Sequence, residues 1–165
     1  MATTHRGQAD KSALEKAAQA FAQTKLGSTL FTTVFPAIDR KVMPLTRGKV
    51  RMSLHFPSLV LHCRGAKSGE PREVPLLYTP RGEQLILVAS RGGHERHPAW
   101  YHNLKAHPDV EVEIDGRRRP MRAREAAGAE RAELWALVTD NYNGYATYQQ
   151  RAGDRRIPVM VLEPR

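Results

Sequence analysis

Beyond residue 57, hydrophobic residues recur in short runs of strand length that are bounded by glycine, proline and aspartate. Two turn sequences, Pro80-Arg81-Gly82 and Asp115-Gly116, are typical of hairpins. Helical spacing appears only at residues 98–106 and 129–141 of this part. The pattern predicts a mainly β fold with α additions (α+β), a small barrel of mostly antiparallel strands. The six expected strands span residues 59–63, 73–79, 85–89, 110–114, 119–124 and 157–162.

The first 57 residues have a different pattern. Helical spacing runs from residue 9 to 22, with Asp10 as a candidate N-cap, and a second apolar stretch at 30–45 ends in basic residues. This second stretch is either an amphipathic helix packed on the domain or a basic apolar segment on an anionic membrane surface. We therefore expect an N-terminal helical extension at 1–57 and a barrel domain at 58–165.

The composition bears on where the protein is expected to reside. The 165 residues contain no apolar run near the ~18 residues that a membrane span needs and no apolar centre typical of a signal peptide. We expect a cytoplasmic protein, with membrane association through the N-terminal helices as an alternative. The single cysteine, Cys63, lies in an apolar strand and is expected to be a packed thiol.

The formal net charge of +9 implies an anionic partner, which could be nucleic acid, acidic lipid or a polyanionic cofactor. The sequence has no helix-turn-helix, zinc-finger or RNP-type motif, so nucleic-acid binding is disfavoured.

Two basic turns follow consecutive predicted strands. Residues 64–72 contain Arg64, Lys67 and Arg72, and residues 89–96 lead to a helix through a glycine pair that Arg91 precedes. Backbone N–H groups of a turn and a helix start, together with arginine, form an anion site. The two turns therefore indicate one shared anionic ligand; solvated, flexible turns are the alternative.

Four histidines fall within fourteen positions: His94, His97, His102 and His107. Their spacing differs from the His-Glu-x-x-His pattern of zinc proteases, and no second cysteine completes a ligand set. We expect no metal site. A serine-hydrolase elbow and a phosphate-binding loop of the ATPase type are also missing from the sequence.

Tyr142, Tyr145 and Tyr148 recur every three residues, which places them on one face of a short helical turn. They form either a core stripe or a cover of phenolic rings over a planar ligand.

Several motifs follow one another between residues 59 and 164: Arg64-Gly-Ala-Lys-Ser-Gly-Glu-Pro-Arg72, Val74-Pro-Leu76, Val88-Ala-Ser-Arg-Gly-Gly93, the segment 97–108 and the tyrosine series. In this order they resemble the deazaflavin-dependent nitroreductase family of actinobacteria. The resemblance implies a split β-barrel, related to FMN-binding pyridoxamine phosphate oxidases. It also implies a reductase that binds the 8-hydroxy-5-deazaflavin coenzyme (F-420), whose tail carries a phosphate and several glutamates.

The resemblance assigns roles by position. The implied cofactor-binding residues are Arg64, Lys67, Ser68, Arg72, Val74, Pro75, Leu76, Ala89, Ser90, Arg91, Gly92, Trp100 and Asn103. The implied catalytic or substrate-orienting residues are Ser90, Tyr142, Tyr145 and Tyr148. At the helix entry, His97 stands where the family usually has asparagine.

The implied activity is hydride transfer to quinones, activated alkenes or nitroaromatic compounds. A non-catalytic split-barrel binder of flavin, haem or lipid is the alternative, and the chain is expected to be a monomer or a homodimer.

Overall fold

The computed structural model describes residues 57–165, so the predicted N-terminal helices, their membrane contact and the boundary at residue 57 lie outside the described residues or at their limit. The strands are β1 (Ser58–Arg64), β2 (Pro71–Leu77), β3 (Thr79–Arg81), β4 (Gln84–Val88), β5 (Asp109–Ile114), β6 (Arg117–Glu125) and β7 (Val159–Pro164). The helical elements are the 3-10 turn η2 (Arg91–Gly93) and the helices α4 (Ala99–Ala106), α5 (Gly128–Asn141) and α6 (Gly144–Arg151).

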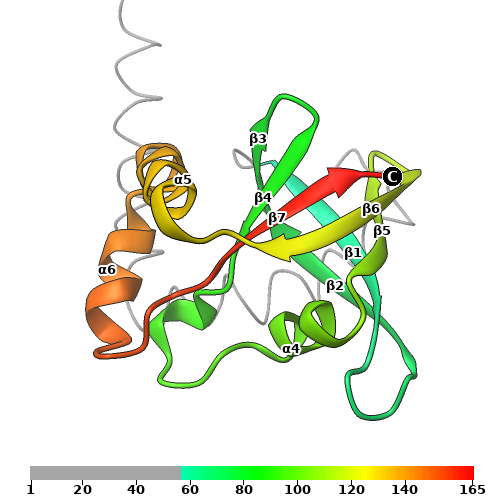
Figure 1. Ribbon diagram of the computed structural model, residues 1–165, viewed down its shortest axis with the longest axis horizontal. Coiled ribbons are helices and arrows are strands. Elements are labelled where there is room, and N and C mark those ends of the chain that lie inside the picture. The colour runs from blue at the N-terminus through cyan, green and yellow to red at the C-terminus, as the bar shows by residue number, and fades with distance from the viewer. Residues whose placement is uncertain (1–56) are drawn as a thin grey trace, which may run out of the picture.

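All seven strands belong to one antiparallel sheet in the order β2-β1-β5-β6-β7-β4-β3. Figure 1 shows the sheet strongly curled, with α5 and α6 together at one side and α4 at a different part of the sheet. The predicted mainly β fold with α additions is confirmed, and both predicted hairpins join adjacent strands, β3 to β4 and β5 to β6.

One predicted strand is wrong in its extent. The run at 73–79 is divided at Tyr78, whose N–H donates to the carbonyl of Pro57. Before this residue the chain forms β2 at one edge of the sheet, and after it the chain forms β3 at the other edge. The apolar pattern continues through the break, so the sequence alone gives no sign of it. Since one residue joins the two edge strands, the curled sheet comes close to closing as a barrel.

Two hydrophobic clusters lie on the two faces of β4 and β7. Leu85 and Leu87 pack in a cluster with Trp100, whereas Ile86 and Val161 pack in a second cluster with side chains of α5 and α6. Burial on both faces explains why these strands read as continuous apolar runs. In β1 the alternation of buried and partly exposed residues marks a strand with one face in the core.

The helices agree with the predicted spans to within about one residue. Pro98 has extended backbone (ψ 151°) and caps α4, so the helix begins at Ala99 rather than at the proline. Tyr145 and Tyr148 lie within α6, whereas Tyr142 has extended backbone and lies just after α5, so the expected helical turn holds two of the three tyrosines. Between residues 57 and 165, none of the helices has the length and apolar character required to span a membrane.

Candidate functional site

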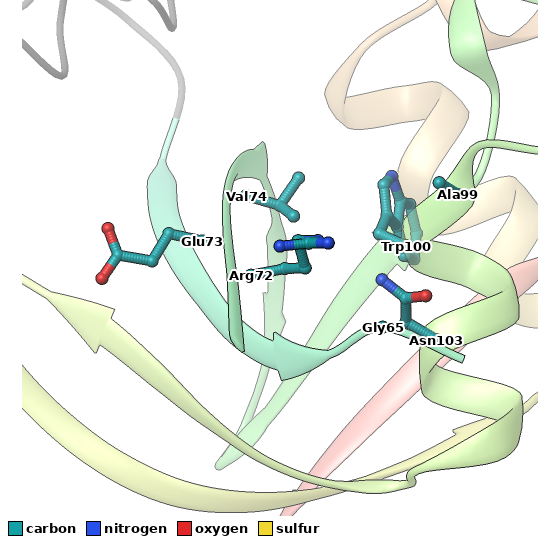
Figure 2. Close-up of a pocket in the computed structure, with 7 residues that line it drawn as sticks. All are labelled: Gly65, Arg72, Glu73, Val74, Ala99, Trp100 and Asn103. Carbon is teal, nitrogen blue, oxygen red and sulfur yellow. The ribbon is translucent and has the colours of Figure 1, made fainter. Parts of the chain in front are cut away.

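A cavity of about 270 Å³ separates the edge strand β2 from α4. Figure 2 shows Arg72 and Val74 on one side, facing Trp100 and Asn103 on the other. The lining residues are Gly65, Arg72, Glu73, Val74, Ala99, Trp100 and Asn103. Four of the predicted cofactor-binding residues are therefore brought together, namely Arg72, Val74, Trp100 and Asn103.

The strand β2 presents alternate side chains to the cavity. Arg72 and Val74 share one face, while the carboxylate of Glu73 points away and lies 3.4 Å from the ring of His62. Among the described strands β2 pairs with β1 alone, so its outer backbone edge is not used by the sheet. Such an edge tolerates Pro71 and Pro75, which lack an N–H donor. The predicted backbone contact at Val74, Pro75 and Leu76 therefore lies on an edge strand.

On the opposite wall, α4 contributes Trp100, which is only 7% exposed, and the buried Asn103. The Asn103 amide oxygen accepts a hydrogen bond from the N–H of Ala66 at 2.9 Å. Its amide nitrogen lies 3.7 Å from the sulfur of Cys63. Burial raises the pKa of this thiol, which agrees with the predicted packed cysteine. Asn103 thus fixes the β1–β2 turn and shapes the cavity wall.

The β1–β2 turn carries Arg64, Lys67 and Ser68. The Ser68 hydroxyl accepts from the N–H of Glu70 at 3.3 Å, and the Arg64 guanidinium donates to the carbonyl of Gly69 at 3.5 Å. In the β1–β2 hairpin, Arg64 pairs with Pro71 and Cys63 pairs with Arg72. Because paired residues share a face of the sheet, the side chain of Arg64 leaves the hairpin on the opposite face from that of Arg72. Arg72 is therefore the cation that lines the cavity, and Arg64 lies at the rim of the turn.

The cations of the two turns have no carboxylate partner among the described residues, whereas several arginines elsewhere do. Within residues 57–165, the structure shows no ion pair for Arg64, Lys67, Arg72 or Arg91. In contrast, Arg81, Arg118, Arg122, Arg124 and Arg165 all pair with acidic side chains. Arg72 lines the aromatic cavity, and Arg64 and Lys67 lie in the adjoining turn, whereas Ser90 and Arg91 are not among the lining residues. An uncompensated cation in an aromatic cavity fits a ligand with a planar ring and a negatively charged tail.

The second turn places Ser90 and Arg91 at the end of β4. Ser90 is 7% exposed, and among the described residues its hydroxyl has no hydrogen-bond partner. Arg91, Gly92 and Gly93 have φ values of 49°, 64° and 83°, in the left-handed region. The Ser90 carbonyl accepts from the N–H of Gly93 at 3.0 Å, which closes the turn. This leaves the serine hydroxyl available to a bound molecule.

The three tyrosines are buried in the cluster formed with α5 and β7. The hydroxyls of Tyr142 and Tyr148 lie 3.2 Å apart, and the ring centres of Tyr142 and Tyr145 are 5.1 Å apart. Burial raises the pKa of both Tyr142 and Tyr145. The packing is that of a core stripe, and α6 reaches the Ser90 turn rather than the cavity at Arg72. Contact between these tyrosines and substrate stays a prediction.

Sequence reasoning missed three of the lining residues and one arginine. Gly65, Glu73 and Ala99 line the cavity without a chemical signature that would single them out. Arg155 contacts the Ser90 turn from a loop 65 residues further along the chain. In the sequence, Arg155 is visible only as the first of two adjacent arginines before Ile157. Nothing in this pair predicts which part of the fold Arg155 contacts. In the described residues no group of histidine, cysteine and acidic side chains could hold a metal ion.

The curled antiparallel sheet and the basic, aromatic cavity beside its edge strand define a class, that of split-barrel proteins that bind an anionic organic cofactor. A family model described as F420H(2)-dependent quinone reductase matches residues 39–164. The chain belongs to this family.

Individual relatives agree with this assignment. The F420H(2)-dependent quinone reductase Rv1261c of Mycobacterium tuberculosis is 45% identical over 112 residues, which are 66% of this chain and 74% of that protein. A solved structure of an F420-H2 dependent reductase (FDR-A) is 42% identical, has a TM-score of 0.60 and covers 65% of this chain and 94% of that chain. Another solved structure, described as a domain-swapped dimer, is 35% identical, with a TM-score of 0.62 over 78% of this chain and 98% of that chain.

Family membership confirms the stated resemblance, the split-barrel fold, the deazaflavin coenzyme as cofactor and a reductase that transfers hydride to quinones. It also favours the reductase over the non-catalytic binder.

Proposed function

We propose that the cavity between β2 and α4 holds the deazaflavin coenzyme of this quinone reductase and that the Ser90 turn completes the reaction site. The observation that carries the proposal is that Arg72, a cation without an ion pair among the described residues, lines one cavity with Trp100. When bound in its reduced form, the coenzyme supplies the hydride that the substrate accepts. The protein binds the coenzyme, orients the acceptor beside it and polarises the acceptor's oxygen.

The cationic turns bind the charged part of the coenzyme. Arg72 lies in the cavity and Arg64 and Lys67 lie in the adjoining turn, where phosphate and carboxylate groups would receive charge-assisted hydrogen bonds. Each such bond contributes about 1.5–3 kcal/mol. The outer backbone edge of β2 and the ring of Trp100 then flank the planar part.

Two hydroxyl groups serve the substrate. Ser90 has no protein partner for its hydroxyl among the described residues and polarises an oxygen of the acceptor. The phenol of Tyr145 keeps its proton at neutral pH, since its ordinary pKa is already about 10 and burial raises the pKa further, and it donates a hydrogen bond as negative charge develops. Nothing in this arrangement demands a quinone specifically, so we include activated alkenes and nitroaromatic compounds among the acceptors.

The test is a turnover measurement with the full chain. Purified protein is mixed with reduced coenzyme and a soluble naphthoquinone, and the return of the oxidised coenzyme's absorbance is followed. We expect protein-dependent oxidation that saturates with both reactants. A nitroaromatic and an enone replace the quinone in parallel reactions. Rates equal to those without protein for every acceptor would contradict the proposal.

A further inference from the structure

Arg155 lies in the loop between α6 and β7, and this loop is held in place by Gln149. The Gln149 side chain donates to the carbonyl of Arg155 at 2.9 Å and accepts from the N–H of Ile157 at 2.9 Å. The N–H of Arg155 donates to the carbonyl of Ala152 at 3.1 Å. The backbone of Arg155 is therefore fixed to the end of α6.

The guanidinium of Arg155 binds main-chain carbonyls on both sides of η2. It donates to the carbonyl of Ala89 at 3.2 Å, to that of Ser90 at 2.7 Å and to that of His94 at 2.8 Å. The remaining contact is with Nδ1 of His97 at 3.0 Å. One planar group thus connects the residues before the turn with those after it.

The turn needs such support because its backbone is strained. Arg91 has a φ of 49°, in the left-handed region that a residue with a side chain adopts only at a cost in free energy. Gly93 packs so closely on α6 that a Cβ there would lie 2.7 Å from the carbonyl oxygen of Tyr148. The hydrogen bonds inside the turn, from Gly93 to Ser90 and from His94 to Arg91, are few and local.

We propose that Arg155 is a positioning residue. It holds the Ser90–Gly93 turn of the coenzyme site in its binding shape by donating hydrogen bonds to the carbonyls of Ala89, Ser90 and His94. Arg155 acts through the turn, and four of its five N–H donors are already used by protein groups. The part of the inference that concerns ligand binding rests on the proposed function, whereas the ordering of the turn does not.

The chain offers a matched control in the next residue. Arg156 has the same charge and lies in the same loop, but among the described residues it makes no hydrogen bond or ion pair. Arg155→Gln and Arg156→Gln therefore change the net charge equally, and only the first removes the guanidinium hydrogen bonds to the turn. Arg155→Lys keeps the charge without the planar fork of donors.

The first measurement is hydrogen exchange of the protein without ligand, followed by NMR. We expect Arg155→Gln to accelerate exchange of the Gly93 and His94 amides by about tenfold or more relative to the wild type, with β5 and β6 amides unchanged. Arg155→Lys should accelerate it less, and Arg156→Gln should leave it unchanged. Equal exchange in Arg155→Gln and Arg156→Gln would overturn the proposal. Should Arg155→Gln fail to fold, wild-type exchange rates in Arg155→Lys would overturn it.

The second measurement is the dissociation constant of the oxidised coenzyme, from quenching of tryptophan fluorescence. A loss of about tenfold in Arg155→Gln beyond the loss in Arg156→Gln supports positioning, and equal losses contradict it. If the wild-type protein fails to bind the coenzyme, the proposed function is wrong, and the exchange experiment still decides whether Arg155 orders the turn.

Discussion

The side-chain oxygen of Asn103 accepts a hydrogen bond from the main-chain N–H of Ala66 at 2.9 Å, and this bond joins α4 to the β1–β2 turn. The amide nitrogen of the same side chain faces Cys63 at 3.7 Å. One residue of the cavity wall therefore sets the distance between the helix that carries Trp100 and the turn that carries Lys67. Loosening that wall should affect both stability and ligand binding.

Replacing this amide tests the connection. Asn103→Ala should lower the free energy of unfolding by about 1–2 kcal/mol, because the part-buried N–H of Ala66 loses its partner. It should also weaken coenzyme binding. Urea denaturation and fluorescence titration measure the two effects. The exposed neighbour His102, changed to Ala, serves as the control on the same helix. Equal stability of the two variants would contradict the role assigned to Asn103.

The sequence predicted most of the sheet because its strands carry local signals. β1 alternates in burial, and turn residues bound β4, so both strands were found within a residue or two of their ends. The boundary at Tyr78 was missed because a passage between two sheet edges is a property of the curled sheet and leaves no mark in the side-chain pattern.

The site was predictable to the extent that its chemistry is local. Basic turns and a tryptophan at a helix start are visible in the sequence, and the resemblance assigns Arg72 and Trp100 to the cofactor. The structure places both side chains at one cavity, and their contact with the cofactor stays a prediction. Arg155 could not be found in this way, because its contacts with Ala89 and Ser90 span 65 or 66 residues.

Arg72 should be required for coenzyme binding and dispensable for folding. It lines the cavity, makes no ion pair among the described residues, and its guanidinium contacts only the carbonyl of Pro71. Arg72→Gln should raise the dissociation constant of the coenzyme about tenfold or more, as expected for the loss of one charge-assisted contact. Its free energy of unfolding should change by less than about 0.5 kcal/mol.

Arg119→Gln is the matched control, since Arg119 is exposed on β6, outside the cavity, and also has no ion pair among residues 57–165. Titrations at one fixed salt concentration compare the two variants. Similar losses of affinity would mean that the coenzyme responds to overall charge and would place its tail elsewhere.

Gly93 should be intolerant of any side chain for two separable reasons. Its φ of 83° is unfavourable for other residues, and a Cβ would lie 2.7 Å from Tyr148 and from Arg151. Gly153 has a φ of 58° and nothing within 4 Å of such a Cβ. Gly153→Ala should therefore lower the free energy of unfolding by about 1 kcal/mol, through the unfavourable φ alone. Gly93→Ala should lower it by at least about 2 kcal/mol more, because the Cβ also clashes.

Thermal and urea unfolding of both alanine variants measure the difference. A Gly93→Ala protein as stable as Gly153→Ala would mean that α6 and η2 move apart at no cost. Such a result would contradict the close packing that couples the tyrosine helix to the Ser90 turn.

His97 should make stability depend on pH below neutrality. Burial lowers its pKa below the ordinary value of 6.5, as do the neighbouring Arg155 and His102, whereas Glu125 opposes the shift. Tyr101 packs on the ring with centres 4.7 Å apart. In the unfolded chain His97 titrates near pH 6.5, so as the pH falls the unfolded state binds its proton before the folded state does. The contribution of His97 is complete above pH 6.5 and is lost as the pH falls through the lowered pKa.

His97→Asn isolates this effect, because an amide oxygen can still accept a hydrogen bond from Arg155 and does not titrate. Urea denaturation at pH 7.5 and 5.0 should show a smaller loss of unfolding free energy in His97→Asn than in the wild type. The difference cannot exceed about 1.4 kcal/mol per pH unit for one proton. Parallel pH profiles would show that His97 protonates without disturbing Arg155, and they would remove the histidine from the set of groups that hold the turn.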